Sequence, residues 1–333
     1  MKTKAILFSA PGQVELREVT VPEPEPDEVL IKTAFTCISP GTELRVLAGK
    51  QPGMPEFPLI PGYALAGIVI ASGEKAGILP GTRVLCSGTS RIEEDKIARC
   101  WGGHCGHAVL RASEVYLLPA TLSLRDAPLT TLAAIAHRGV QHSRPQKGET
   151  VIVIGLGPVG VLSARLHALS GARVIGADLR QERAELVRRS GLEAVSGDTL
   201  FEQLHALVPE GASVIVDATG APEIVEKAIR LAHDVPFGES DQLGARYVLQ
   251  GSYAQALPLP YQAAFMKELT FVLPRNTRPE DIGQTLELIA QKKLIVHDLA
   301  SITLPAEEAP HAYELLQQRT PEIQSILFEW SRF

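Results

Sequence analysis

The sequence is short of cysteine, of long apolar runs and of positive charge, and each shortage excludes a class of protein. Four cysteines in 333 residues, Cys37, Cys86, Cys100 and Cys105, are too few for a disulfide scaffold and favour a reducing compartment. No segment reaches the roughly 20 consecutive apolar residues that span a bilayer. The apolar run at 5–10 is too short for a signal peptide. We therefore expect a cytoplasmic protein that does not enter a membrane.

The charge balance argues against a nucleic-acid partner. The chain carries 32 Lys and Arg against 38 Asp and Glu, a net charge of −6, and no basic run. Nucleic-acid sites usually show as clustered basic surface. A hydrophobic content of 45% supports a large core, and the length suggests two domains. We expect a small molecule as the partner.

The first 120 residues read as β-rich. Short runs of Val, Ile, Leu and Thr stand between Pro-Gly, Pro-Glu and Ser-Gly turn signals. We predict strands at residues 4–8, 14–19, 28–36, 67–72, 83–86 and 108–111. Many short strands with regular turns are typical of a barrel or sandwich.

From residue 124 the pattern alternates between strand and helix. We predict helices at 124–143, 161–169, 180–190 and 224–231, and apolar strands at 150–154, 173–177, 213–217 and 246–251. Strands without polar alternation, each followed by a helix, indicate a doubly wound parallel sheet with both faces covered. Two further helices, at 279–292 and 305–319, end the chain, and Thr303 is the expected cap of the second.

The segment VIVIGLGPVG at 151–160 is the strongest functional signal. A buried strand precedes it and a helix follows it, which is the context that a G-x-G-x-x-G fingerprint requires. Gly155 permits the tight turn, Gly157 lets the backbone approach a pyrophosphate, and Gly160 allows close packing of helix on strand. The helix N-terminus then offers N–H groups and partial positive charge to the phosphates.

Asp178, 18 residues beyond Gly160, stands where the ribose-binding acid of such units is found. A carboxylate there binds the ribose hydroxyls and repels a 2′-phosphate, which favours NAD over NADP. Arg180 argues against a strict preference for NAD, because a guanidinium near the ribose can accommodate that phosphate. The turn at 217–220 ends a later strand at the same edge and is expected to touch the nicotinamide half. The predicted cofactor-binding residues are Gly155, Leu156, Gly157, Pro158, Val159, Gly160, Asp178, Leu179, Arg180, Ala218, Thr219, Gly251 and Arg275.

Together these segments resemble the medium-chain dehydrogenase/reductase superfamily over nearly the full length. PEPEPDEVLIK at 22–32 is similar to the entry into its GroES-like domain, and PLIPGYALAGIV at 58–69 to its P-x-I-x-G-H-E-x-x-G-x-V segment. LPGTRV at 79–84 and WGG at 101–103 match further turns. The resemblance implies an α/β protein with a GroES-like catalytic domain at 1–123, a Rossmann domain at 124–272 and a C-terminal return at 273–333. It also implies an active site in the cleft and a homodimer or homotetramer. We take the strand at 246–251 as the pairing edge.

The chain departs from the zinc-binding branch at the ligand positions. Ser39 stands where the catalytic cysteine is expected, and Tyr63 and Ala64 replace the His and Glu of G-H-E. Hydroxyls are poor zinc ligands beside thiolate and imidazole. No C-x-x-C is present for a structural zinc, so we predict no zinc. CWGGHCGH at 100–107 leaves open a soft-metal site, plain structure or a histidine lining the cleft.

Without zinc, side chains must hold the substrate oxygen and move its proton. The candidates are Tyr63 as donor, Ser39 as relay, and His104 or His107 as base. Glu43 is a further base, or merely a first-turn acid that stabilises a helix. A packed tyrosine and a plain Ser-Pro-Gly turn are the structural alternatives for Tyr63 and Ser39.

The sequence favours one function and leaves two alternatives open. The first is a zinc-independent, NAD-dependent dehydrogenase that oxidises a secondary alcohol, such as a polyol, cyclitol, sugar derivative or hydroxyethyl group. TCISPGTE at 36–43 is similar to a branch that includes the bacteriochlorophyllide hydroxyethyl dehydrogenases. The second is a quinone or enone reductase using NAD(P)H, against which the glycine pattern and Asp178 argue. The third is a non-catalytic NAD-binding protein.

Overall fold

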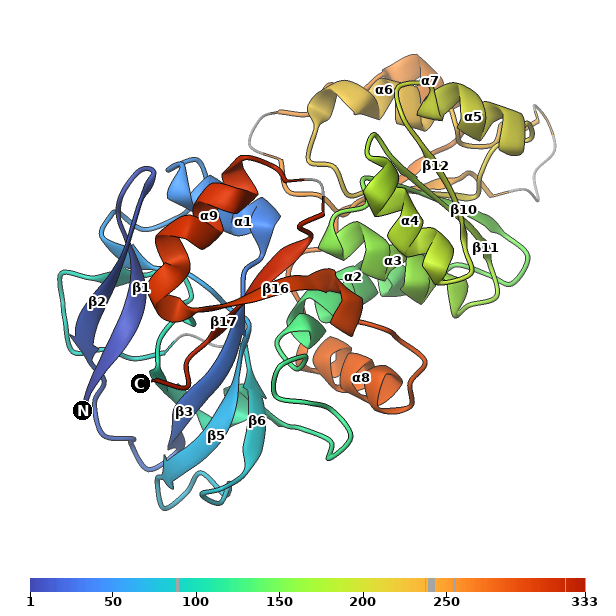
Figure 1. Ribbon diagram of the computed structural model, residues 1–333. Coiled ribbons are helices and arrows are strands. Elements are labelled where there is room, and N and C mark those ends of the chain that lie inside the picture. Colours follow the sequence, from blue (N-terminus) through green and yellow to red (C-terminus); the bar gives the residue numbers. More distant parts are fainter. Residues whose placement is uncertain (88–89, 237, 239–242, 254–255, 321, 333) are drawn as a thin grey trace. The chain divides into compact units, whose positions relative to one another are not determined.

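The computed structural model describes residues 1–87, 90–236, 238, 243–253, 256–320 and 322–332. The chain divides into two compact units. Unit 1 comprises Met1–Leu132, Leu286–Gln291 and Val296–Phe333, and unit 2 comprises Ala133–Thr285 and Lys292–Ile295. Both ends of the chain therefore belong to unit 1 (Figure 1).

Unit 1 is built on two sheets. One has the order β2-β1-β4-β7, and the other has the order β16-β17-β3-β5-β6-β9, with β8 paired to β3. The strands are β1 Lys2–Ala10, β2 Gln13–Thr20, β3 Glu28–Cys37, β4 Leu59–Ile60, β5 Leu65–Ser72, β6 Arg83–Cys86, β7 Ala98–Arg99, β8 His107–Arg111, β9 Val115–Leu117, β16 Ala300–Pro305 and β17 Ser325–Glu329.

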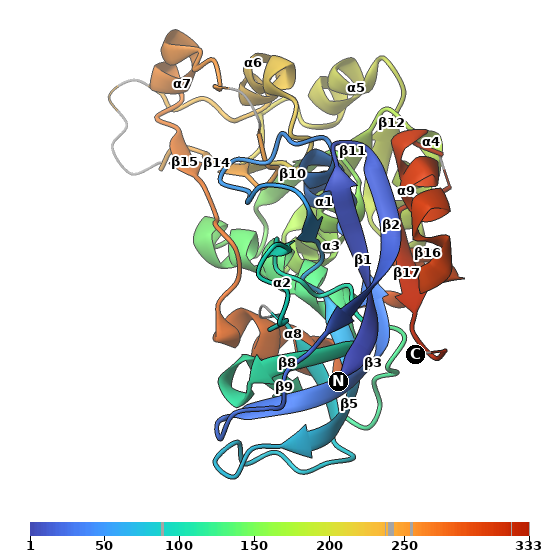
Figure 2. The same ribbon diagram turned by 90° about the vertical axis from the view of Figure 1, so that its left-hand side faces the viewer.

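Alternation along β1 joins the two cores of unit 1. Ala5 and Leu7 point into a cluster formed with β3, β5 and β6. Ile6 and Phe8 point the other way, into a cluster that includes Tyr313. Helix α9, Ala309–Gln317, carries Tyr313 and lies along the β1–β2 hairpin (Figure 2). Helix α1, Pro40–Leu47, follows β3 directly.

Unit 2 contains a six-stranded sheet with the order β12-β11-β10-β13-β14-β15, in which all neighbours are parallel. Its strands are β10 Thr150–Ile154, β11 Arg173–Asp178, β12 Glu193–Ser196, β13 Val214–Asp217, β14 Arg246–Leu249 and β15 Thr270–Val272. The remaining helices are α2 Leu129–Ser143, α3 Pro158–Ala168, α4 Gln181–Arg189, α5 Leu200–Leu207, α6 Val225–Ile229, α7 Tyr261–Met266 and α8 Pro279–Ala290. Short 3₁₀ turns lie at Ala112–Glu114, Pro222–Ile224, His297–Leu299 and Ala306–Glu308.

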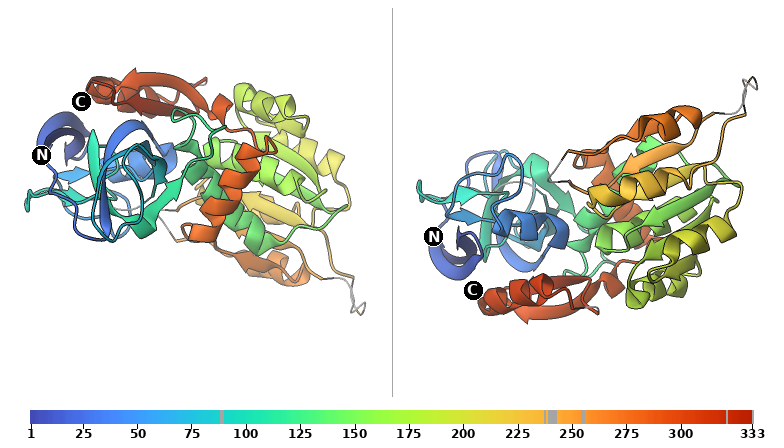
Figure 3. Two further views of the ribbon diagram at one scale, coloured as in Figure 1. Left: turned by 90° about the horizontal axis from the view of Figure 1, so that it is seen from below. Right: turned by 90° about the horizontal axis from the view of Figure 1, so that it is seen from above.

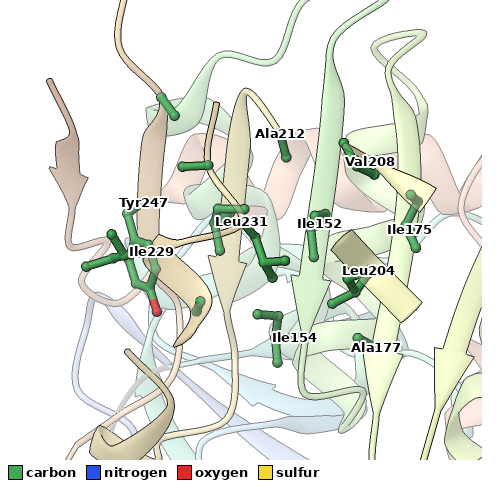
Figure 4. Close-up of a cluster of buried hydrophobic side chains, with 14 of the residues drawn as sticks. Ile152, Ile154, Ile175, Ala177, Leu204, Val208, Ala212, Ile229, Leu231 and Tyr247 are labelled. Carbon is green, nitrogen blue, oxygen red and sulfur yellow. The ribbon is translucent and has the colours of Figure 1, made fainter. Parts of the chain in front are cut away.

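Helices cover both faces of this sheet (Figure 3). Ile152, Ile154 and Ile175 form a buried cluster with Leu204 of α5 and Ile229 of α6 (Figure 4). Gly176, between Ile175 and Ala177 on β11, faces the other way, toward Val187 of α4. The expected class, a β-rich GroES-like part with a doubly wound parallel sheet, is confirmed. Within the described ranges, no helix combines the length and apolar character needed to cross a bilayer.

Three details of the sequence prediction are wrong. The strand at 246–251 is not the sheet edge, because β15 pairs with β14 and takes that place. Thr303 lies inside β16 and caps no helix, and α9 starts later, with Pro310 in its first turn, where proline is tolerated. The helix predicted from 124 begins at Leu129, because Pro128 disfavours helical backbone at the preceding residue.

Candidate functional site

The turn between β10 and α3 makes a different demand on each of its three glycines. Gly155 has φ +87°, which side-chain-bearing residues rarely adopt. A Cβ on Gly160 would lie 1.8 Å from the carbonyl oxygen of Gly155, so only glycine allows α3 to pack this close. A Cβ on Gly157 would meet nothing within 4 Å. The fold therefore requires glycine at positions 155 and 160, whereas Gly157 leaves open space beside the backbone.

Helix α3 begins without a capping side chain. Gly157 is its N-cap and Pro158 stands at its first position. The first-turn N–H groups of a helix, here those of Val159 and Gly160, have no acceptor within the helix. Together with the helix dipole they attract an anion. The open space at Gly157 therefore adjoins an anion-binding helix end.

Asp178 ties the glycine turn to the end of β11. Its side chain is buried; Oδ2 accepts the N–H of Leu156 at 2.7 Å and Oδ1 accepts the N–H of Arg180 at 2.9 Å. The Arg183 guanidinium lies 3.7 Å from Oδ2. A carboxylate oxygen can accept two hydrogen bonds, and the two backbone N–H groups use one position on each oxygen. Leu179, the next residue, is 66% exposed.

A second turn follows β13. The fully buried Asp217 accepts the N–H of Thr219 at 3.0 Å, its hydroxyl at 2.6 Å and the phenol of Tyr247 at 3.0 Å. Burial and the adjacent carboxylate raise the pKa of Tyr247, which keeps it a donor. Ala218 donates its N–H to the Ile154 carbonyl at 2.9 Å.

These turns meet at the carboxyl edge of the sheet. Gly251 donates its N–H to the carbonyl of Asp217 at 2.8 Å, and a Cβ on Gly251 would lie 2.6 Å from the nitrogen of Gly220. In parallel sheets ligands bind outside this edge. Arg275 is exposed and follows β15, two strands away from β13. The residues present at this edge fit a dinucleotide.

In unit 1 the structure brings Ser39 and Tyr63 together. The Tyr63 phenol donates to Ser39 Oγ at 2.5 Å, and its ring packs edge-on against Trp101. Burial raises the pKa of Tyr63 to about 12. Ser39 is the N-cap of α1, but its hydroxyl caps no N–H group of that helix. The two hydroxyls are therefore bonded to each other, with Tyr63 as donor.

Glu43, which contacts the backbone of Ser39, and His104, which contacts Glu43, are fully buried. Glu43 Oε1 accepts the backbone N–H of Ser39 at 2.8 Å, and Oε2 lies 2.9 Å from His104 Nε2. His104 Nδ1 lies 2.8 Å from the hydroxyl of Thr36. Both ring nitrogens of His104 are thus engaged inside the protein.

His107 is not part of this group. It lies on β8, half-buried, with Nδ1 3.0 Å from the hydroxyl of Thr3, and burial lowers its pKa. His137, on α2, contacts Asp281 at 3.1 Å and Gln141 at 3.2 Å in unit 2. The catalytic candidates therefore reduce to one connected set of four, Ser39, Tyr63, Glu43 and His104.

The donors for a transition metal do not converge. The thiol of Cys105 donates to the Gly102 carbonyl, and Cys37 contacts the hydroxyl of Ser325 at 3.2 Å. Burial raises the pKa of Cys37 to about 12, and the described cysteines are free. Over the described ranges, no three His, Cys, Asp or Glu side chains form a group that could hold a metal ion.

Sequence reasoning missed two contacts that the end of the chain makes with Glu43 and with Thr36, the partner of His104. The Tyr313 phenol donates to Glu43 Oε2 at 2.5 Å, and Trp330 Nε1 donates to the hydroxyl of Thr36 at 3.0 Å. These pairs are 270 and 294 residues apart in sequence. No local pattern marks such contacts.

Two family models match the chain. The alcohol dehydrogenase GroES-like domain matches residues 25–120, and the zinc-binding dehydrogenase model matches residues 158–291. The chain belongs to the medium-chain dehydrogenase/reductase superfamily. It is thus an oxidoreductase of that superfamily, whose members bind a nicotinamide cofactor.

Relatives match over the whole length. The 2-desacetyl-2-hydroxyethyl bacteriochlorophyllide A dehydrogenase of Cereibacter sphaeroides is 27% identical, over 99% of each chain. A short chain alcohol dehydrogenase from Escherichia coli CFT073, crystallised with NADH, is 22% identical with a TM-score of 0.84, over 98% of this chain and 99% of that one. A zinc-binding dehydrogenase from Sinorhizobium meliloti, bound to NADP, is 23% identical with a TM-score of 0.83, over 99% of each. The two crystal structures support the fold alone.

Proposed function

We propose that the protein is a zinc-independent, NAD-dependent dehydrogenase that oxidises a secondary alcohol to a ketone. The substrate classes are a polyol, a cyclitol, a sugar derivative or a hydroxyethyl group on a larger ring system. The hydroxyethyl class is favoured by the full-length relative from Cereibacter sphaeroides, which is named for that substrate. The observation that carries the proposal is the bonded hydroxyl pair of Ser39 and Tyr63.

The chemistry of the donors around that pair supports the proposed zinc independence. Zinc in proteins takes thiolate, imidazole or carboxylate ligands. Ser39 and Tyr63 offer neutral hydroxyls, and Cys37 is a neutral thiol turned toward Ser325. His104 uses both ring nitrogens on Glu43 and Thr36. The nearby side chains that zinc would prefer are therefore committed elsewhere.

The preference for NAD rests on Asp178. Its two oxygens keep lone pairs for the ribose hydroxyls, and its negative charge disfavours a 2′-phosphate. Arg183 sits 3.7 Å from this carboxylate and partly offsets its charge, so the preference is expected to be moderate rather than absolute. Leu179 offers an exposed apolar side chain beside the ribose position.

When bound, NAD⁺ supplies the acceptor for the hydride of the alcohol. The part of Ser39 and Tyr63 is to hold the substrate oxygen and move its proton. Tyr63 donates to Ser39, so the Ser39 proton is left for the substrate oxygen. On oxidation the order of donors reverses: Ser39 accepts the alcohol proton and donates its own to Tyr63. Tyr63 in turn gives up its phenol proton to the neighbouring Thr42 hydroxyl, and the partly exposed Thr42 releases one proton to solvent.

The decisive experiment is turnover with a panel of polyols, cyclitols and hydroxyethyl compounds, followed by the absorbance of reduced cofactor. We expect NADH formation, undiminished in protein that contains less than 0.1 equivalent of zinc by elemental analysis. Activity that tracks a stoichiometric metal ion contradicts zinc independence. Consumption of NADPH with enones would make the chain a reductase, and tight NAD binding without turnover a non-catalytic binding protein.

We further propose that the protein is a homo-oligomer that pairs through β15. This strand ends the sheet of unit 2, and an unpaired edge favours pairing with another strand. Exposed apolar side chains accompany it, namely Tyr261 and Phe265 on α7 and Leu273 just beyond the strand. A second copy of the chain covers both features at once.

A further inference from the structure

Glu43 is a buried carboxylate that the proton transfer proposed above does not use. Its side chain has no solvent exposure, yet three donors surround it. The Ser39 N–H lies 2.8 Å from Oε1, while the Tyr313 phenol and His104 Nε2 lie 2.5 Å and 2.9 Å from Oε2. Burying a carboxylate is tolerated only where such donors replace water. The arrangement is therefore built around this one side chain.

The hydrogen bonds around Glu43 are closed inside the protein. Trp330 Nε1 can only donate, so the hydroxyl oxygen of Thr36 accepts from it. The same hydroxyl lies 2.8 Å from His104 Nδ1, and the other ring nitrogen of His104 faces Glu43 Oε2. Glu43 therefore accepts from donors of the protein itself, and neither ring nitrogen of His104 is left for a substrate.

The contact with Ser39 links this group to the proposed hydroxyl pair. A serine at a helix N-cap normally uses its hydroxyl to accept an N–H of the first turn. Here the Ser39 hydroxyl makes no capping bond. Glu43 instead reaches back by four residues and accepts the backbone N–H of Ser39. The Ser39 hydroxyl is thereby left to Tyr63.

We propose that Glu43 is a positioning residue that acts through Ser39: held by Tyr313 and His104, it fixes the Ser39 backbone so that its hydroxyl meets Tyr63 and the substrate oxygen. This inference rests on the proposed function. It assigns Glu43 and His104 to orientation, not to proton exchange with substrate. Burial is the main reason for the raised pKa of Tyr63, and the charge of Glu43 adds to it, so Glu43 also favours the protonated phenol.

The elements that hold Glu43 come from both ends of the chain. Glu43 lies in the first turn of α1, and Tyr313 lies on the neighbouring α9 (Figure 1). His104 precedes β8, and its ring packs edge-on against Phe328 of β17. The C-terminal segment therefore supplies a donor and a packing surface to the group. A substitution in that segment that removes one of these contacts is expected to shift the backbone of Ser39 through Glu43.

The test is a double-mutant cycle on kcat, with NAD and the best alcohol of the panel. Glu43→Gln keeps the size of the side chain but turns an NH₂ group or a weaker acceptor toward donors. We expect kcat to fall at least tenfold, with the Kd of NAD unchanged. In a Ser39→Ala background the same change should alter kcat by less than twofold, because a residue that acts through Ser39 has nothing left to position. Glu56→Gln, exposed and in the same unit, is the matched control and should be neutral in both backgrounds.

A purely structural role gives a different result. Losses that multiply, with Glu43→Gln costing the same factor with and without the Ser39 hydroxyl, overturn the positioning role and leave the proposed function standing. If Glu43→Gln does not fold, Tyr313→Phe replaces it in the same cycle, since it removes one donor to Glu43 and keeps the Ser39 contact. Full activity of Ser39→Ala, or no turnover by the wild-type protein, refutes both the proposed function and this inference.

Discussion

Replacing Gly157 by alanine should separate the stability of unit 2 from its ability to bind NAD. The backbone of Gly157 has φ −66° and ψ 180°, which alanine adopts without strain, and its Cβ would meet nothing within 4 Å. A glycine-to-alanine change at such a position stabilises a protein by about 0.4–1 kcal/mol, because the unfolded chain loses freedom. The folded protein should therefore be as stable as the wild type or slightly more so.

Binding should move in the opposite direction. On the proposed path the pyrophosphate approaches the first turn of α3 through the space beside Gly157, so a methyl group there would displace it. Losing one hydrogen bond to a charged phosphate costs about 1.5–3 kcal/mol, which is at least tenfold in Kd. Calorimetry with NAD and urea denaturation measure the two quantities on one sample. An unchanged Kd would refute the proposed path of the pyrophosphate.

Gly160→Ala is the contrasting variant. Its Cβ would lie 1.8 Å from the Gly155 carbonyl oxygen, so α3 must move away from β10. Overpacking of this kind typically costs 1–3 kcal/mol, and here it offsets the gain that alanine brings to a helix. We expect lower stability and lower affinity together. Loss of NAD binding with gained stability should thus occur at position 157 only.

Three further predictions concern charge, assembly and pH. Asp178→Asn should lower the preference for NAD over NADP at least tenfold in kcat/KM, while the exposed Asp198→Asn should not change it. Leu273→Lys should shift the oligomer toward monomer in light scattering, whereas Leu79→Lys, at a still more exposed leucine in unit 1, should not. Burial lowers the pKa of His167 to about 4 from 6.5, so the folded state favours the neutral ring. This contribution, about 3 kcal/mol at most, is complete above pH 6.5 and is lost as pH falls toward 4. Urea midpoints should therefore drop over that range in the wild type and less in His167→Gln, and parallel curves would contradict the assignment.

The parallel sheet was predictable because its signals are local. Continuous apolar runs mark β10, β11 and β13, and each is followed by a helical pattern within a few residues. The edge was not predictable in the same way. β15 is three residues long, too short to show a period, so the sequence pattern points to the longer strand β14 as the edge. Likewise β16 and β17 hold their places through long-range pairing with each other and with β3.

The glycine turn with Asp178 and the group around Glu43 differ in how well the sequence predicts them, and the reason is the same. The glycine turn and Asp178 are separated by fixed, short distances along the chain, because one strand–helix–strand unit builds them. The contacts of Glu43 follow no such rule. Its position in the sequence is compatible with a base or with a first-turn acid, and only the fold adds Tyr313 and His104 to Oε2.

The contacts of Glu43 also explain how the hydroxyl pair of Ser39 and Tyr63 keeps its geometry without a metal ion. A metal ion fixes its ligands by coordination, whereas Ser39 and Tyr63 have only one bond to each other and rotate about their side-chain torsions. That bond keeps its geometry only if the start of α1 does not move. Pro40 restricts the backbone on one side of Ser39, and Glu43 holds its N–H on the other. Because Glu43 is itself held by Tyr313 and His104, substitutions in α9 far from the substrate should lower kcat before they lower the affinity for NAD.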